Sequence, residues 1–86
     1  MPPRVVYSRH ASQMLTERNI RPEWVLRTIE TPDVLEDDPR QPAVKRAFLT
    51  IPENGNRVLR VAYTESQDEI RIITFFFDRR RKTPSP

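Results

Sequence analysis

The sequence predicts an α+β fold of two layers, in which two N-terminal helices pack on a mainly antiparallel sheet in the order β-α-α-β-β-β. Two amphipathic helical stretches follow a short apolar run near the N-terminus. Three runs rich in β-branched and aromatic residues come next, and polar turn residues separate them. Because each helix has one apolar stripe and the sheet has an apolar face, the two layers are expected to cover each other.

The N-terminal part of the chain predicts a strand followed by a helix. Residues 4–7 form a strand-like run that is expected to add an edge to the sheet. Ser8 is a suitable N-cap for a helix from Arg9 to Arg18. Three residues at helical spacing supply its apolar stripe: Ala11, Met14 and Leu15.

A second helix is predicted to begin at Pro22, which suits a first helical position, and to end at Thr31-Pro32. Its buried stripe is expected to consist of Val25, Leu26 and Ile29. Trp24 lies at the edge of that stripe, where it marks either a partner contact or the periphery of the core. The acidic segment 33–42 contains two prolines and predicts a loop with at most a short strand.

The C-terminal half predicts a three-strand antiparallel meander with runs at 47–51, 58–63 and 70–77. Asn54-Gly55 is expected at the tip of the first hairpin, because both residues of a type I′ turn need positive φ. With Thr64 opposite Glu69 in the second hairpin, alternation predicts a core face made of Phe48, Leu59, Val61, Tyr63, Ile70, Ile72 and Phe76. The other face is expected to carry Leu49, Ile51, Val58, Ile73, Phe75 and Phe77 together with Lys45, Arg60 and Arg71.

The cations on this second face are the most informative feature. The assumed pairing places Arg71 opposite Ala62 and diagonal to Arg60, so that two or three cations share a small patch of sheet. An ordinary solvated sheet face is the plainer interpretation. Tyr63, which could donate a proton, falls on the core side.

Composition limits the classes of function. The 86 residues make one domain, predicted to span 4–78, with a basic, disordered tail at 79–86. The absence of cysteine excludes disulfides, thiol catalysis and Cys-based zinc sites, and no apolar run is long enough for a membrane span. We therefore expect a cytoplasmic protein. Of the net charge of +3, the tail cations Arg79, Arg80, Arg81 and Lys82 supply four, which leaves −1 for the rest.

The order of elements and four short motifs resemble a family of small uncharacterised bacterial domains, similar to the BrnT-like toxins of the RelE/ParE superfamily. The motifs are Tyr7-Ser8-Arg9-His10-Ala11, Glu17-Arg18-Asn19-Ile20, Thr31-Pro32-Asp33 and Arg71-Ile72-Ile73-Thr74. The resemblance implies a toxin-antitoxin protein whose helix-free sheet face cradles RNA, free or on the ribosome, and cleaves it by 2′-hydroxyl attack without a metal or other cofactor. It also implies an antitoxin protein as partner.

The resemblance matches Arg71 to the arginine that opens the Arg-Ile-Ile-Ser/Thr strand, and His10 to the early-helix histidine. Candidate catalytic residues are therefore His10 as acid or base, with Arg60 and Arg71 as phosphate-binding or charge-stabilising groups. Candidate RNA-binding residues are Lys45 and the tail cations. Glu17 and Arg18 are expected to support the site structurally.

Two alternatives remain open. His10 can be a capping or packing histidine, and a basic tail can be merely solubilising. At the level of the whole protein, the alternative to a toxin-like ribonuclease is a non-catalytic interaction module of the same fold, which binds nucleic acid or a protein partner.

Overall fold

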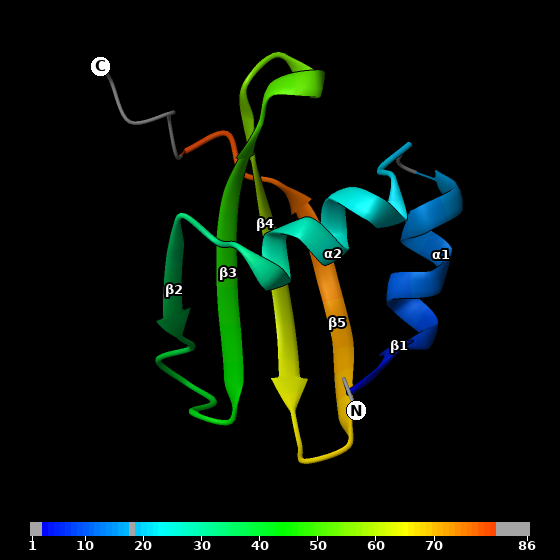
Figure 1. The fold of residues 1–86 in the computed structure, drawn as a ribbon, viewed down its shortest axis with the longest axis vertical. Helices are drawn as coiled ribbons and strands as arrows, with labels where there is room; N and C mark the ends of the chain where they lie inside the picture. The colour runs from blue at the N-terminus through cyan, green and yellow to red at the C-terminus, as the bar shows by residue number, and fades with distance from the viewer. Residues whose placement is uncertain (1–2, 18, 81–86) are drawn as a thin grey trace.

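The computed structural model describes residues 3–17 and 19–80. Its elements are β1 (Arg4–Tyr7), α1 (Arg9–Glu17), α2 (Pro22–Glu30), β2 (Val34–Asp37), β3 (Val44–Ile51), the 3₁₀ turn η1 (Pro52–Asn54), β4 (Arg57–Glu65) and β5 (Glu69–Phe77). The strands form one sheet in the order β1-β5-β4-β3-β2, parallel only between β1 and β5. The predicted two-layer α+β fold is confirmed (Figure 1). The acidic segment contributes the additional short strand β2.

Helix α1 is fastened to β5 at its first residue. The Ser8 hydroxyl accepts the backbone N–H of Ala11 at 3.1 Å, as predicted for an N-cap, and donates to the carbonyl of Ile73 at 2.9 Å. The Ser8 backbone N–H donates to the carbonyl of Ile72, also at 2.9 Å. The helix therefore lies beside β5 where β1 ends (Figure 1).

Helix α2 packs on β3 and β4 and begins at Pro22 as predicted. Val25 is fully buried, and Trp24 is 8% exposed with its ring edge-on to Phe77 at 6.1 Å between centroids. Of the two interpretations of Trp24, the periphery of the core is the one that the structure shows.

The connection between β3 and β4 differs from the predicted two-residue turn. Pro52 has no N–H for the ladder and starts η1, after which Gly55 and Asn56 adopt positive φ values of 68° and 61°. The Asn56 N–H donates to the carbonyl of Ile51 at 3.1 Å and closes a five-residue loop. The prediction that Asn54-Gly55 forms the turn tip was therefore wrong by one residue.

That single residue reverses every side chain of β3 relative to the prediction, because successive side chains alternate between the faces of a sheet. Phe48 pairs with Arg60 and faces away from the helices, whereas we expected it on the helix side. Its side chain is nevertheless buried, as expected, with 2% exposed. Leu49 and Ile51, which were expected outside, face the helices. Lys45 moves to the helix side, and Arg46 takes its place on the helix-free face.

A bulge in β5 causes the second reversal. Tyr63 pairs with Ile72 while Ala62 pairs with Thr74, so Ile73 is an extra residue. Beyond it, Phe75 is fully buried on the helix side. The prediction that Phe75 and Phe77 face outward and Phe76 inward was wrong, since this part of β5 is turned over.

The β4–β5 hairpin is tighter than expected. The Ser66 N–H donates to the carbonyl of Glu69 at 2.8 Å, so only Gln67 and Asp68 form the turn. As a result Thr64 pairs with Arg71 rather than with Glu69. The expected diagonal between Arg71 and Arg60 is therefore wrong.

The central part of the core matches the sequence prediction. Leu59, Val61 and Ile72 are fully buried, and Ile70 is 8% exposed, beneath the helical layer. Tyr63 is 4% exposed and belongs to the same cluster, as expected. Arg60 and Arg71 lie on the helix-free side, as the alternation of β4 and of the start of β5 predicted. Within the described residues, no helix is long and apolar enough to cross a membrane.

An ion pair at the surface links η1 to α2. The guanidinium of Arg27 donates to both carboxylate oxygens of Glu53, at 3.0 and 2.7 Å. The hydrogen bonds from Arg27 are the main reason that the pKa of Glu53 falls from 4.5 to about 2. This bidentate contact holds the five-residue loop 52–56 against α2.

The bulge predicts a difference in stability between two adjacent phenylalanines. Phe75→Ala should lower the free energy of unfolding by about 3–5 kcal/mol, because it empties a fully buried site. Phe76→Ala, on the partly exposed side, should cost less than half as much. Urea denaturation of both variants measures the difference. Equal losses, or a larger loss for Phe76→Ala, would contradict the bulge and favour a strand whose side chains alternate without interruption.

The Arg27–Glu53 pair predicts a pH effect. Since the folded pKa of Glu53 is depressed, the pair stabilises the fold fully above about pH 4.5 and progressively less as pH falls towards 2. NMR titration should find the Glu53 carboxyl titrating near pH 2, and Arg27→Gln should return it towards 4.5. Arg21→Gln is the matched control, because Arg21 is the weakest contributor to this shift. An ordinary Glu53 titration in the wild type would refute the contact.

Candidate nucleic-acid interface

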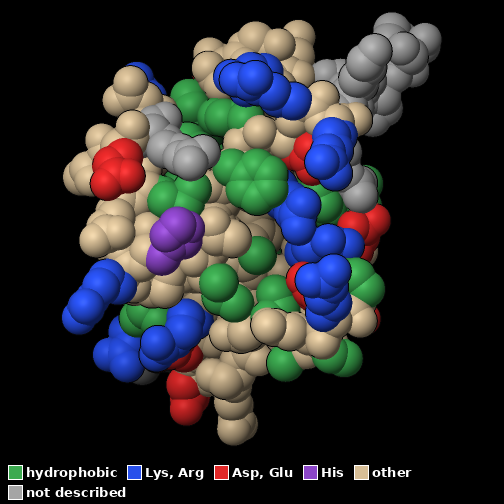
Figure 2. Space-filling view, turned by 180° about the vertical axis from the view of Figure 1, so that it is seen from behind, with side chains coloured by type: hydrophobic (Ala, Val, Ile, Leu, Met, Phe, Trp, Pro, Cys, Tyr) green, Lys and Arg blue, Asp and Glu red, His purple; other side chains and the backbone are tan. Residues whose placement is uncertain are grey.

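The helix-free face of the sheet gathers arginine, aromatic and histidine side chains. Seen from behind, it has a group of Lys and Arg side chains on the right, apolar side chains in the middle and the histidine on the left (Figure 2). The pairing of β3, β4 and β5 brings Phe48, Arg60 and Phe76 into one row across the face. The next row contains Arg46, Ala62 and Thr74.

Arg60 occupies the centre of the first row. Its guanidinium carbon lies 5.1 Å from the ring centroid of Phe76 and 5.9 Å from that of Phe48. These are cation–π distances. The nearest anion is Asp78, with 3.9 Å between Nη1 and Oδ2, which is an ion pair too long for a hydrogen bond. The buried Nε–H of Arg60 has no hydrogen-bond partner among the described residues.

Arg46 lies diagonal to Arg60 on the neighbouring strand. Its Nη2 is 3.3 Å from Oε1 of Glu36, and its side chain is 21% exposed. Its buried Nε–H likewise has no hydrogen-bond partner within the described part of the chain. Hydrogen bonds from the backbone N–H of Arg40, supported by other groups including Arg46 and Arg60, lower the pKa of the nearby Asp38. Two arginines are thus held at the surface with donor capacity that the fold leaves unused.

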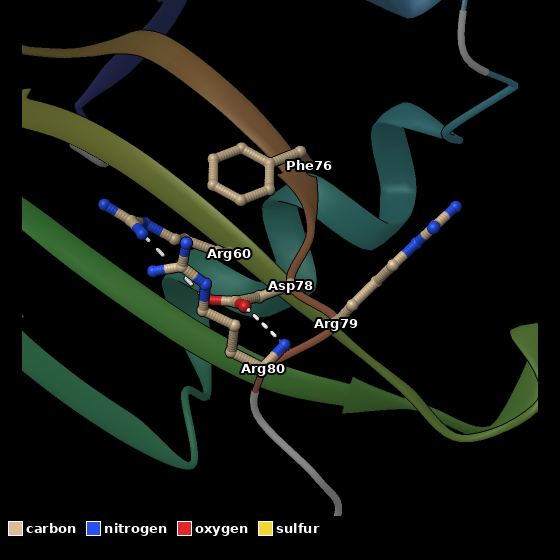
Figure 3. A pocket seen from close by; sticks show the side chains of 5 residues that line it. All are labelled: Arg60, Phe76, Asp78, Arg79 and Arg80. Carbon is tan, nitrogen blue, oxygen red and sulfur yellow. Dashed lines mark hydrogen bonds and ion pairs between the residues drawn. The ribbon is translucent and has the colours of Figure 1, made fainter.

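A hollow of about 410 Å³ opens beside this row. Its lining consists of Arg60, Phe76, Asp78, Arg79 and Arg80. Arg60, Asp78 and Arg80 converge, whereas the Arg79 side chain extends away from them (Figure 3). Asp78 fixes the turn, because its Oδ1 accepts the Arg80 backbone N–H at 2.9 Å and its own N–H donates to the carbonyl of Val58 at 2.8 Å. Two arginine side chains and one carboxylate therefore meet beside the ring of Phe76.

His10 reaches the same face from α1. Its Nε2 lies 3.3 Å from Oγ1 of Thr74, and that hydroxyl donates to Sδ of Met14 at 3.4 Å. In the tautomer that carries its proton on Nε2, the ring donates to this oxygen and Nδ1 is left as an acceptor. His10 is exposed, so this nitrogen can meet a ligand.

Thr74 relates the histidine to both predicted catalytic arginines. It is the diagonal neighbour of Arg60, which places their Cα atoms about 7–8 Å apart. On its other side Arg71 is next along the face of β5. The guanidinium of Arg71 turns towards Glu69 and donates to Oε2 at 3.2–3.3 Å. The predicted trio therefore shares one face, with Arg60 and Arg71 on either side of Thr74 rather than in one patch.

Lys45 does not join these residues. It lies on the helix side of β3 and pairs with Glu65 at 3.8 Å. Its predicted place beside Arg60 was wrong for the reason that turned over β3, the five-residue loop. Tyr63 is also remote from the helix-free face, and burial, followed by the charge of Glu65, raises its pKa.

Three further predicted residues are not tested by the geometry. Arg18, Arg81 and Lys82 lie outside the described residues. Glu17 is exposed at the end of α1. Arg79 and Arg80, by contrast, line the hollow as described above.

Sequence reasoning missed three contributors: Arg46, Thr74 and Asp78. Arg46 and Lys45 are adjacent in the chain and therefore face opposite sides of the sheet. Only the number of residues in the 52–56 loop decides which of them lies on the helix-free face. Thr74 was part of a quoted motif, but its contact with His10 depends on the bulge. No group of three or more potential metal-ligating side chains is found in residues 3–17 and 19–80.

A family model described as a domain of unknown function, DUF4258, matches residues 7–77, which is most of the chain. The chain belongs to the DUF4258 family. No curated protein and no solved structure matches it significantly. The matched span of this DUF4258 domain includes His10, Arg46, Arg60, Thr74 and Phe76, whereas Asp78, Arg79 and Arg80 follow it. The similarity to BrnT-like toxins stays a prediction.

Proposed function

We propose that this protein acts on RNA and that single-stranded RNA binds across the helix-free face of its sheet. The observation that carries the proposal is the row of Phe48, Arg60 and Phe76, in which the buried ring of Phe48 and the partly exposed ring of Phe76 hold a guanidinium whose side chain is 27% exposed. Guanidinium groups bind phosphates, and unstacked bases stack on aromatic rings and on guanidinium planes. This combination suits a single strand, whose bases are free to stack.

The charges favour directed contacts over a general attraction to polyanions. Arg46, Arg60 and Arg80 stand close to Glu36 and Asp78, so the face has only a small excess of positive charge. Binding then depends on individual guanidinium–phosphate hydrogen bonds, which the partly exposed side chains of Arg46 and Arg60 can donate.

The resemblance to BrnT-like toxins gives the proposal its biological setting. In that setting the protein is a toxin-like member of a toxin-antitoxin pair, its RNA is free or on the ribosome, and its protein partner is an antitoxin. A non-catalytic module that binds RNA would use the same face.

A second candidate function, RNA cleavage without a metal, is favoured by the contact between His10 and Thr74. His10 Nδ1 would take the proton of a 2′-hydroxyl, and that oxygen would attack the adjacent phosphorus. The bond from phosphorus to the 5′-oxygen would break, and the 2′-oxygen would stay bonded to phosphorus in a cyclic phosphate. The 5′-oxygen would take a proton from a water molecule, to which the protonated His10 would return its proton. Arg60 would stabilise the charge that develops on the phosphoryl oxygens.

Adjacent residues of β3 provide the test of binding. Arg46→Gln should weaken binding of a fluorescein-labelled 12-nucleotide single-stranded RNA about tenfold at low salt, through loss of a charge-assisted contact. It should also reduce the slope of log K against log salt by about 0.7. Lys45→Gln, on the opposite face, is the matched control and should change neither quantity. Fluorescence anisotropy across a salt series measures both, and equal effects of the two substitutions would refute the interface.

Cleavage has its own test. If His10 transfers a proton, His10→Ala should lower the cleavage rate by ~10²-fold and remove one limb of the pH–rate profile, while RNA binding changes little. Gln13→Ala, an exposed substitution on the same helix, should cleave like wild type. Labelled RNA that stays intact with wild-type protein, both with and without ribosomes, would eliminate this second candidate and leave the RNA-binding proposal in place.

A further inference from the structure

The hollow beside Arg60 contains a carboxylate that phosphate binding does not explain. Asp78 has a side chain only 11% exposed, and it faces the space into which Arg60 and Arg80 converge (Figure 3). A negative charge there opposes the approach of a phosphate. Its Oδ1 holds the Arg80 N–H, but its Oδ2 stands 3.9 Å from Arg60 and accepts no hydrogen bond within the described part of the chain. An acceptor is therefore held at the edge of an otherwise cationic site.

We infer that this hollow is a guanine subsite, an inference that rests on the proposed function. Guanine presents two adjacent donors on its Watson–Crick edge, N1–H and the 2-amino group. The Asp78 carboxylate can accept both, through Oδ2 and through the second lone pair of Oδ1, whose first lone pair accepts the Arg80 N–H. Adenine, cytosine and uracil each offer a single donor group on that edge. Asp78 therefore discriminates by hydrogen bonding, and the arginines supply the attraction for the attached phosphate.

The surroundings of Asp78 fit one nucleotide. The partly exposed ring of Phe76 provides an apolar wall for the base, and Arg80, whose side chain turns towards Arg60 and Asp78, is placed for the phosphate (Figure 3). The volume of about 410 Å³ lies within the range of small-molecule sites. Since Arg60 already packs on Phe76, the base and the guanidinium share the aromatic surface.

The experiment compares GMP, AMP and single-stranded RNA hexamers that differ only by one G or A, titrated into the ¹⁵N-labelled full chain and followed by NMR. Wild type should prefer guanine over adenine by about 5- to 150-fold. Asp78→Asn keeps an oxygen for the Arg80 N–H but puts an NH₂ donor opposite the donors of guanine. It should abolish the preference, with the amide shifts of Arg79 and Arg80 reporting the site.

The controls separate base recognition from charge. Asp37→Asn, on exposed β2, removes the same charge elsewhere and should retain the guanine preference. If Asp78 acted by charge alone, Asp78→Asn would raise the affinity for every ligand equally and would leave the preference intact, which overturns the inference. A melting curve for each variant confirms that the comparison is made on folded protein.

The outcomes also separate this inference from the proposed function. RNA binding without base preference overturns the guanine subsite and leaves the RNA proposal standing. Guanine-selective binding of GMP without binding of the hexamers supports the subsite for a free nucleotide and refutes RNA as the ligand. Absence of binding by both classes of ligand overturns both.

Discussion

The extra residue in β5 is the constraint on which the arrangement of the molecule depends. If side chains alternated without interruption from Ile70 onward, Phe75 would lie on the helix-free face, opposite to Ile72, and would leave the core. Ile73 corrects the phase, and its carbonyl accepts the Ser8 hydroxyl at 2.9 Å. Because Ser8 also caps α1, the bulge and the start of the helix are fixed by one side chain. The core and the position of His10 are thus set together.

The bulge also determines the electrostatics of the helix-free face. By turning Phe76 outward it provides the second ring against Arg60, whose other neighbour is Phe48. A guanidinium held by two rings has less rotamer freedom to lose on binding an anion, and its contact with Asp78 at 3.9 Å is too long for a hydrogen bond. Arg60 is therefore positioned mainly by packing, which leaves its hydrogen-bond donors for a ligand.

The sequence predicted every helix and the three long strands, because N-caps, prolines and apolar periodicity act locally. It did not predict which face of the sheet the side chains of β3 and of the end of β5 occupy. That face depends on the exact number of residues in the loop and in the bulge. The Asn54-Gly55 signal suggested an even-numbered turn, whereas Pro52 starts a 3₁₀ turn and makes the loop five residues long. One residue decides between Lys45 and Arg46 as the cation of the interface. The bulge left no local signal, since Ile73 is as suited to a regular strand as Ile72. Arg60 and Arg71 keep the predicted face, because neither reversal involves β4 or the part of β5 before the bulge.

Binding and cleavage make different demands on this face. Binding requires only that phosphates meet the arginines and that a base meets a ring, which the row of Arg60 and Phe76 can satisfy alone. Cleavage requires in addition that the 2′-hydroxyl come within hydrogen-bond reach of His10 while its phosphate touches a cation. Thr74 contacts His10 on one side and is the diagonal neighbour of Arg60 on the other. A phosphate that contacts both His10 and Arg60 therefore has to lie over the Thr74 side chain. The Thr74 hydroxyl, which contacts both Met14 and His10, therefore positions the group that cleavage needs in addition to those that bind RNA.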